Sequence, residues 1–416
     1  MVGTAAENAE SARSGRPPLP AEIADLTDPG NRENPYPSLE KLRRRSPYAP
    51  FDGLLVVGRH DQCSALLRDQ TMSAARDRAP LSPTPHGPRT RNFLHLDPPD
   101  HTRYRRLVTG AFTRRKVDGM APWIRGIATD LFRAAAEAGS LEVINDLAYP
   151  LPLRVICELL GVPYEDRRLL QDWSSELAAV LDPPLGSTGR MTRDAARARA
   201  GFVHYFRRLI EERRSTPRQD LISHLLQIEE DGHQLDEDDV LATCVLLLNA
   251  GHETTVNLIG NAVLALLRHP GQLDRLRADP TLAPAVVEEV LRYDAPVQMT
   301  TRVAREHGAI GDARFRPGDT VLFLLGAANR DPDVYPDPDR FDIDRSPAAA
   351  HLAFSAGAHF CLGAGLARLE IAIALELFST FLVRPRLRPG GVTYKRNLNL
   401  RGPSHLLVDF DGVRTG

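Results

Sequence analysis

A long succession of helical segments is the feature of this sequence that most constrains its fold. From about residue 101 to residue 293, apolar residues recur at helical spacing, with breaks at LDPPLGSTG (181 to 189) and STPRQD (215 to 220). Segments typical of β-structure lie on both sides. PYAPFDGLLVVG predicts a hairpin turned at Asp52 and Gly53, and residues 297 to 325 contain a Pro-Gly turn that leads into an apolar strand. The pattern predicts a mostly α-helical fold with small β-sheets, of the α+β class.

Composition narrows the domain organisation and the kinds of partner. No linker divides the 416 residues, so we expect a disordered leader at residues 1 to 30 and a single domain at residues 31 to 416. The net charge of −2 argues against nucleic-acid binding, and His252 and Glu253 interrupt the most apolar helical run, which argues against a membrane span. The four cysteines form no CxxC pair, which indicates a reducing compartment. We expect a cytoplasmic monomer without nucleic-acid or membrane partners.

Cys361 lies in the glycine-rich stretch FSAGAHFCLGAGLARLE (354 to 370), which runs directly into an apolar helix. The positive end of a helix dipole and the unpaired N–H groups there favour a thiolate. A thiolate suits either a nucleophile or a metal ligand. The alternative, for this cysteine taken alone, is an inert buried thiol before a glycine turn.

The sequence AGHETT, residues 250 to 255, stands in the middle of a helix predicted over residues 238 to 268. Gly251 is a poor helix former, and the Thr254 hydroxyl can bond the carbonyl one turn back, so we expect a local bulge. Ala250 and Thr254 share a helical face with Gly251 beside them, which leaves room for a broad, flat group. Glu253 lies roughly 100° round the helix and would reach the alcohol only through a relay. The alternative is a helix with a buried threonine and a surface glutamate.

Further charged residues occur in patterns that indicate a binding site only when they are considered together. EEVLRY places Glu289 and Arg292 three residues apart on one helical face, as an ion pair. Four cationic or donor side chains are candidates for binding the two carboxylates of a large apolar cofactor. They are His101, Arg105, Arg302 and His359. Each of them, taken alone, is better explained as a solvated surface residue.

Together these motifs resemble those of the soluble bacterial cytochromes P450. The ligand loop of that family, FxxGxHxCxG, is matched at every fixed position, by Phe354, Gly357, His359, Cys361 and Gly363. AGHETT is similar to the oxygen-activation helix, EEVLRY to the ExxR pair, and PDRF, with Arg340, to the meander that follows. HTRYRR and TTRVA resemble the propionate-binding segments. The resemblance runs in the expected order over nearly the whole chain from about residue 34.

The resemblance implies the cytochrome P450 fold, a triangular prism of helices. Haem b would lie between the oxygen-activation helix and the helix after the ligand loop, with Cys361 as the thiolate ligand that favours O–O cleavage. The propionates would be bound by His101, Arg105, Arg302 and His359. The macrocycle would also be contacted by Phe354, Gly363, Ala250 and Gly251. A structural ion network would be formed by Glu289, Arg292 and Arg340.

The resemblance also implies a monooxygenase that inserts one atom of O2 into a small organic substrate by hydroxylation or epoxidation. Thr254 and Glu253 would deliver protons, and electrons from NAD(P)H would arrive through a ferredoxin and its reductase, or through a flavodoxin. Three alternatives are a peroxide-driven peroxygenase, an enzyme of oxidative coupling or desaturation, and a haem-binding protein without turnover. Peroxygenase relatives tend to lack the acid and alcohol pair that is present here.

The substrate pocket is also implied only by resemblance. It would be lined by residues 71 to 97, by residues 172 to 205, by the helix face before Ala250 that includes Leu247, and by PVQMT. In the last segment, Gln298 offers a polar contact and Met299 an adaptable apolar one. We expect a bacterial secondary metabolite as substrate, although no motif identifies which one.

Overall fold

A computed structural model describes residues 21–75, 93–178, 189–230, 233–345 and 350–414. The predicted disordered leader lies outside the described residues up to residue 20. Beyond that point the prediction is wrong, because α2 (Ala21–Thr27) and η1 (Pro29–Asn31) occupy the remainder. Ile23 and Leu26 are buried in one apolar cluster with Leu39 and Leu42 of the next helix. Burial of these two side chains packs the segment against the core.

Helices form most of the described structure, as predicted. Proline stands in the first turn of α7, α8, α13 and α14, where its missing N–H costs nothing. Gly139 and Gly161, both at positive φ, end α7 and α8. The helices are α3 (Tyr36–Arg45), α4 (His60–Arg68), α5 (Asp100–Thr109), α6 (Arg114–Gly119), α7 (Ala121–Ala138), α8 (Pro150–Leu160), α9 (Arg167–Ala178), α10 (Gly189–Ser215), α11 (Leu221–Gln227), α12 (Glu237–Arg268), α13 (Pro270–Ala278), α14 (Ala283–Tyr293), α15 (Leu325–Ala328) and α16 (Ala364–Phe381).

The sheets are small, also as predicted. β1 (Tyr48–Phe51) and β2 (Leu54–Val57) form the predicted hairpin, and Gly53 takes the positive φ of its turn. With β3 (Met72–Ser73), β7 (Thr300–Ala304) and β10 (Thr320–Phe323) they make a sheet in the order β1-β2-β10-β7-β3. A second sheet has the order β12-β13-β4, from β4 (Leu141–Glu142), β12 (Arg386–Tyr394) and β13 (Pro403–Asp409). The remaining pairs are β5 (Glu229–Glu230) with β6 (His233–Gln234), β8 (Gly308–Ile310) with β9 (Ala313–Phe315), and β11 (Leu382–Val383) with β14 (Gly412–Val413).

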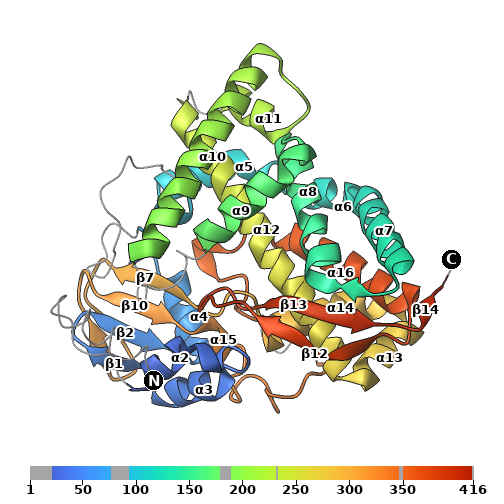
Figure 1. The fold of residues 1–416 in the computed structure, drawn as a ribbon. Helices are drawn as coiled ribbons and strands as arrows, with labels where there is room; N and C mark the ends of the chain where they lie inside the picture. Colours follow the sequence, from blue (N-terminus) through green and yellow to red (C-terminus); the bar gives the residue numbers. More distant parts are fainter. Residues whose placement is uncertain (1–20, 76–92, 179–188, 231–232, 346–349, 415–416) are drawn as a thin grey trace.

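The long helix α12 is the axis of the helical part. In Figure 1 the helices form a triangular body with the sheets along its lower side, and α12 runs through the middle. It packs against α8, α9, α10, α14 and α16, and nearly all of its second half is buried. None of the helices in the described residues is long and apolar enough to span a membrane.

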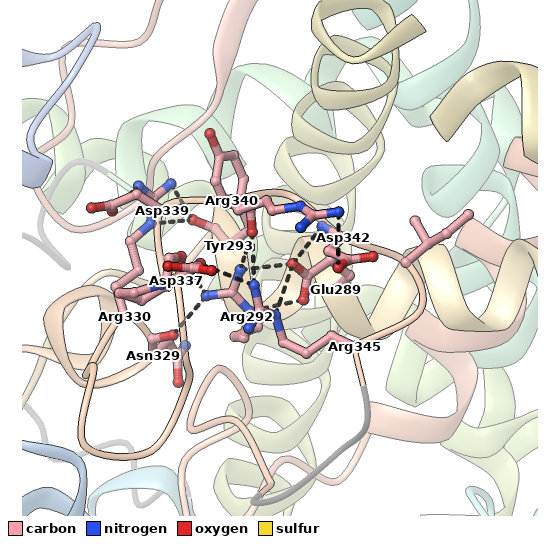
Figure 2. A network of polar contacts seen from close by, with 12 residues as sticks. Glu289, Arg292, Tyr293, Asn329, Arg330, Asp337, Asp339, Arg340, Asp342 and Arg345 are labelled. Atoms are coloured by element: carbon pink, nitrogen blue, oxygen red, sulfur yellow. Dashed lines mark hydrogen bonds and ion pairs between the residues drawn. The ribbon is translucent and has the colours of Figure 1, made fainter. Parts of the chain in front are cut away.

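A buried ion pair ties α14 to the irregular segment that follows α15. The Nε and Nη2 atoms of Arg292 donate to the two carboxylate oxygens of Glu289 over 2.8 and 2.7 Å, and both side chains are almost fully buried. The other donations from Arg292 go to the backbone carbonyls of Asn329, Pro338 and Arg340, over 3.2, 2.8 and 3.1 Å. The predicted ExxR pair is therefore the anchor of residues 329 to 340, as Figure 2 shows.

The third member of this network is Arg345, and the prediction of Arg340 is wrong. The Arg345 Nε lies 3.4 Å from Glu289 Oε1, and its other nitrogens donate to the carbonyls of Pro336, Asp337 and Arg340. The Arg340 side chain is 66% exposed and pairs with Asp342 at 3.6 Å instead. Figure 2 shows the Arg340 guanidinium turned to Asp342. Arg340 contributes its carbonyl to the network, because the chain turns there and directs its side chain outward.

This network makes a prediction for stability. Arg345→Ala should lower the free energy of unfolding by about 2–3 kcal/mol, because it leaves Glu289 short of a counter-charge and several carbonyls without a donor. Arg340→Ala, the matched control, should change it by less than about 0.5 kcal/mol, because its ion pair is exposed. Urea denaturation followed by circular dichroism measures both. Equal losses for the two variants would contradict the assignment of Arg345.

Candidate functional site

The Cys361 loop is held in a single backbone shape before α16. The Cys361 N–H donates to the Phe354 carbonyl over 2.9 Å, which closes the loop. Gly357 has a φ of +69°, and a Cβ there would lie 2.5 Å from the Leu67 carbonyl oxygen, so only glycine fits. A Cβ on Gly363 would meet no atom within 4 Å, so this part of the loop borders open space. The loop thus presents Cys361 at the start of α16, as predicted.

The environment of Cys361 combines burial with positive charge. Burial raises the pKa of its thiol, whereas the Gly363 N–H and the guanidinium groups of Arg105 and Arg368 act in the opposite direction. Arg105 also donates to the Phe360 carbonyl over 2.6 Å, directly before the cysteine. A metal cation bound to the sulfur would favour the thiolate further.

The structure brings the four predicted carboxylate-binding side chains together from three separate segments. The rings of His101, on α5, and His359, in the ligand loop, have centroids 4.1 Å apart. Burial, Arg302, His101 and Arg105 together lower the pKa of His359 to about 3. Burial and the same two arginines also lower the pKa of His101. These mutual effects place Arg105 and Arg302 close to both rings.

This cluster fits the anionic edge of a cofactor. His101 is 2% exposed, and neither of its ring nitrogens has a hydrogen-bond partner among the described residues. Buried polar groups normally have partners, and the charges of Arg105 and Arg302 act on this ring. A pair of carboxylates would supply acceptors and balance the guanidinium charges. Haem propionates have this chemistry, and the cysteine loop lies beside the cluster, because Arg105 contacts both.

Iron at Cys361 would have to arrive within such a cofactor. No group of three His, Cys, Asp or Glu side chains in the described part of the chain could hold a metal ion. A single protein sulfur is the ligand set that haem-thiolate proteins use. The residues present therefore fit haem.

The middle of α12 presents the small residues that were predicted to leave room for a flat group. The Thr254 hydroxyl donates to the Ala250 carbonyl over 2.6 Å. A Cβ on Gly251 would lie 3.5 Å from the Ile156 side chain, an ordinary contact. The predicted bulge does not form, because α12 is an uninterrupted α-helix from Glu237 to Arg268. The threonine bond is added to the helical hydrogen bonds without displacing them.

Glu253 is buried, and the interpretation of a surface glutamate is excluded. Its side chain is 5% exposed, and Lys395 Nζ lies 2.9 Å from its Oε2. The hydroxyls of Tyr149 and Ser175 donate to its Oε1 over 3.0 and 3.3 Å. Burial acts to raise the pKa of Glu253, but Lys395, His252 and these hydrogen bonds outweigh it and lower the pKa. The carboxylate is therefore ionised at neutral pH.

The predicted substrate-pocket residues are only partly brought together. Leu247 lies on α12, one turn before Ala250 and Gly251, and is 7% exposed. Met299 packs in an apolar cluster with Leu39 and Leu322, and its place in the substrate pocket stays a prediction. Gln298 lines a small cavity with Met299, and its amide donates to the Ala295 carbonyl over 2.7 Å. Both side chains lie under the amino-terminal helices. Residues 76 to 92 of the predicted pocket lie outside the described residues.

Several residues of the site were missed by sequence reasoning. Lys395 and Tyr149 lie 142 and 104 positions from Glu253, and neither stands in a motif. Arg345 follows Arg340 in the same acidic stretch, and nothing in the sequence tells which arginine turns inward.

Comparison with known proteins agrees with this site. The family model described as Cytochrome P450 matches residues 51–388. The 6-deoxyerythronolide B hydroxylase of Saccharopolyspora erythraea is 37% identical over 94% of this chain and 99% of its own length. The crystal structure of ligand-free CYP164A2 from Mycobacterium smegmatis has a TM-score of 0.86 and 45% identity, and it covers 93% of this chain and 99% of its own. The structure of P450BioI in complex with a hexadec-9Z-enoic acid ligated acyl carrier protein has a TM-score of 0.84 and 37% identity, with coverages of 92% and 99%. The chain belongs to the cytochrome P450 family of haem monooxygenases.

Proposed function

We propose that this enzyme hydroxylates or epoxidises an organic substrate of secondary metabolism, with O2 and with electrons from NAD(P)H that pass through a ferredoxin or flavodoxin. The observation that carries the proposal is the position of Cys361 beside the cluster of His101, His359, Arg105 and Arg302. Haem b, held there by Cys361 and with its propionates at the cluster, supplies the oxygen chemistry when bound. The protein supplies binding, orientation and protons.

The residues of α12 suit proton delivery. Thr254 carries a hydroxyl one turn after the exposed Ala250, and the adjacent Glu253 is an ionised acid with a counter-ion. A hydroxyl can hold water and pass a proton, and a carboxylate can replenish it. This acid and alcohol pair favours the O2-dependent reaction over a peroxide-driven one. NADPH-dependent O2 consumption with surrogate redox partners separates a monooxygenase from a peroxygenase and from a haem-binding protein without turnover.

Relatives support the substrate class. One relative is named as a 6-deoxyerythronolide B hydroxylase, and another was solved with an acyl chain on its carrier protein. Both suggest an oxidised intermediate of a biosynthetic assembly line. A screen for compounds that convert the haem from low to high spin tests this directly. Coupling or desaturation would use the same machinery and would be recognised from the mass of the product.

The electron donor is proposed to dock on a basic surface around the cysteine loop. The side chain of Phe360, the residue before Cys361, is exposed, and its carbonyl is bound by Arg105 of α5. Basic residues of α5 and α6 make up the surface. They are Arg103, Arg106, Arg114, Arg115 and Lys116. Positive charge there would steer an acidic ferredoxin to the short electron path at Cys361.

The haem-thiolate assignment predicts a spectrum. The reduced protein with carbon monoxide should show the red-shifted Soret band of thiolate-ligated haem, and Cys361→Ala should abolish that band, because no other sulfur lies in the loop. The matched variant Cys63→Ala, at a buried cysteine of α4, should keep it. A band that survives Cys361→Ala would rule out this ligand.

The role of Thr254 predicts uncoupling. Thr254→Ala should retain haem binding and reduction but divert electrons to hydrogen peroxide, with product per NADPH falling by about tenfold or more, because positioned proton transfer is worth about 10² to 10⁴ in rate. Thr255→Ala, the neighbouring control, should remain coupled, since its hydroxyl bonds the Gly251 carbonyl and is buried. If Thr254→Ala stays fully coupled, the proton comes from another group.

The docking surface predicts a salt-dependent rate. Reversing the exposed Arg114 and Arg115 to glutamate should slow reduction by an acidic ferredoxin by about tenfold at low salt and flatten its dependence on ionic strength. The control reverses Lys41 and Arg44, whose side chains are 61% and 74% exposed, on α3, a helix that lies far from α6 in Figure 1. Equal rates for both double variants would argue against docking at α6.

A further inference from the structure

A row of polar side chains on α12 faces the segment between β12 and β13. Glu253, Asn257 and Asn261 are spaced four residues apart, so they lie one above another on one helical face. Lys395 pairs with Glu253 at 2.9 Å, and Asn261 Nδ2 donates to the Arg401 carbonyl over 3.2 Å. Between them, Asn257 lies directly against Gly402, where a Cβ would come within 2.6 Å of Asn257 Oδ1. Residues 395 to 402 therefore follow the polar row along its length.

We call the contact between this polar row of α12 and residues 395 to 402 the seam. The seam contains buried polar atoms that could bind a water molecule. Neither amide atom of Asn257 has a hydrogen-bond partner among the described residues, although the residue is fully buried, and the same holds for Gln298 Oε1. Gln298 lines a cavity of about 20 Å³ together with Lys395, Arg401 and Gly402. A cavity of this size holds one water molecule, which the polar groups in its lining, Gln298 among them, can bind.

Lys395 is the member of the seam that connects Glu253 to this cavity. The Lys395 side chain is 18% exposed, whereas that of Glu253 is 5% exposed. Its ammonium has three N–H donors, so it can bind the carboxylate and still bind water. Only three of the 52 lysines and arginines in the chain are lysines. At nearly every other cationic position the chain has an arginine, whereas the group that pairs with Glu253 is a compact ammonium.

We propose that Lys395 is a positioning residue for oxygen activation, which holds Glu253 as an ionised carboxylate and links it to water on the side of residues 395 to 402. Protons for Thr254 reach Glu253 along this seam. The inference rests on the proposed monooxygenase function and adds the path by which its acid exchanges protons with solvent. The competing path runs through Ser175, an exposed residue whose hydroxyl lies 3.3 Å from Glu253 Oε1.

The charges that face Glu253 set the direction of the expected change. The titratable groups that act on it directly are Lys395 beside β12, His252 on α12 and Tyr149 just before α8. The Ser175 hydroxyl on α9 also contacts it, and the charge of Asp172 acts on Tyr149. The pKa of His252 is lowered to about 4 by burial, so His252 is neutral at neutral pH. Lys395 is then the positive group that keeps the carboxylate ionised. Without it, burial acts against the ionised form, so the pKa of Glu253 should rise and the protonated fraction should fall as pH rises.

Infrared spectroscopy of the resting holoprotein tests the ion pair without turnover. Lys395→Met should show, at pH 7, a protonated-carboxyl band that is missing from wild type and from the double variant Lys395→Met/Glu253→Gln. Glu370, a buried carboxyl whose pKa is raised by burial, contributes equally to every variant and cancels in the difference. Lys395→Arg should behave like wild type, because the charge is kept. No new band in Lys395→Met would overturn the assignment.

The pH profile of turnover tests the path. Lys395→Met should consume O2 about tenfold more slowly than wild type at pH 7 and recover as pH rises, because Glu253 then ionises. Lys395→Arg should restore the wild-type profile, and Lys41→Met, which removes an exposed ion pair with Asp25, should not change it. A Lys395→Met profile parallel to wild type, or a Ser175→Ala variant that reproduces its loss, would overturn the proposal. If wild type consumes no O2, the monooxygenase function fails, while the infrared result still decides the ion pair.

Discussion

The buried pair of Glu289 and Arg292 is the interaction on which the position of the cysteine loop depends. Arg292 donates to the Asn329 carbonyl, and the Asn329 side chain in turn accepts from the Leu352 N–H over 2.7 Å. Leu352 lies two residues before Phe354, whose carbonyl closes the loop on Cys361. A buried ion pair is costly to desolvate and strongly destabilising to break. Here its hydrogen bonds run through Asn329 and Leu352 to the segment that closes the Cys361 loop.

Charge is arranged differently on the two sides of the site. At the edge formed by His101, His359, Arg105 and Arg302, cationic and donor groups gather, and burial together with the arginines lowers the pKa of both imidazoles. On α12 the charge is balanced within the protein, because Lys395 lies against Glu253. The first arrangement suits an anionic group bound from outside the chain. The second keeps an acid ionised in a buried position, where it can exchange protons repeatedly.

Burial of Glu253 also changes how the oxygen-activation helix is understood. An acid at the surface would exchange protons with bulk water and would need no support. A carboxylate that is 5% exposed depends on the side chains packed on it, which come from α8, α9 and the segment after β12. The environment of Glu253 is therefore formed by four chain segments, although the motif AGHETT lies in one.

The sequence by itself determined the fold class, the ligand loop and the short-range pairs. Cys361, Gly357 and the Glu289–Arg292 pair were predictable because their geometry is fixed within one turn or one loop. The convergence of His101, Arg105, Arg302 and His359 was one option among the residues and was favoured only through resemblance, since these residues lie on separate segments. Tertiary structure alone decided that Arg345 replaces Arg340, that Met299 packs into the amino-terminal core, and that Lys395 neutralises Glu253. Each of these depends on which way a side chain turns when distant segments pack, and local spacing carries no information about that.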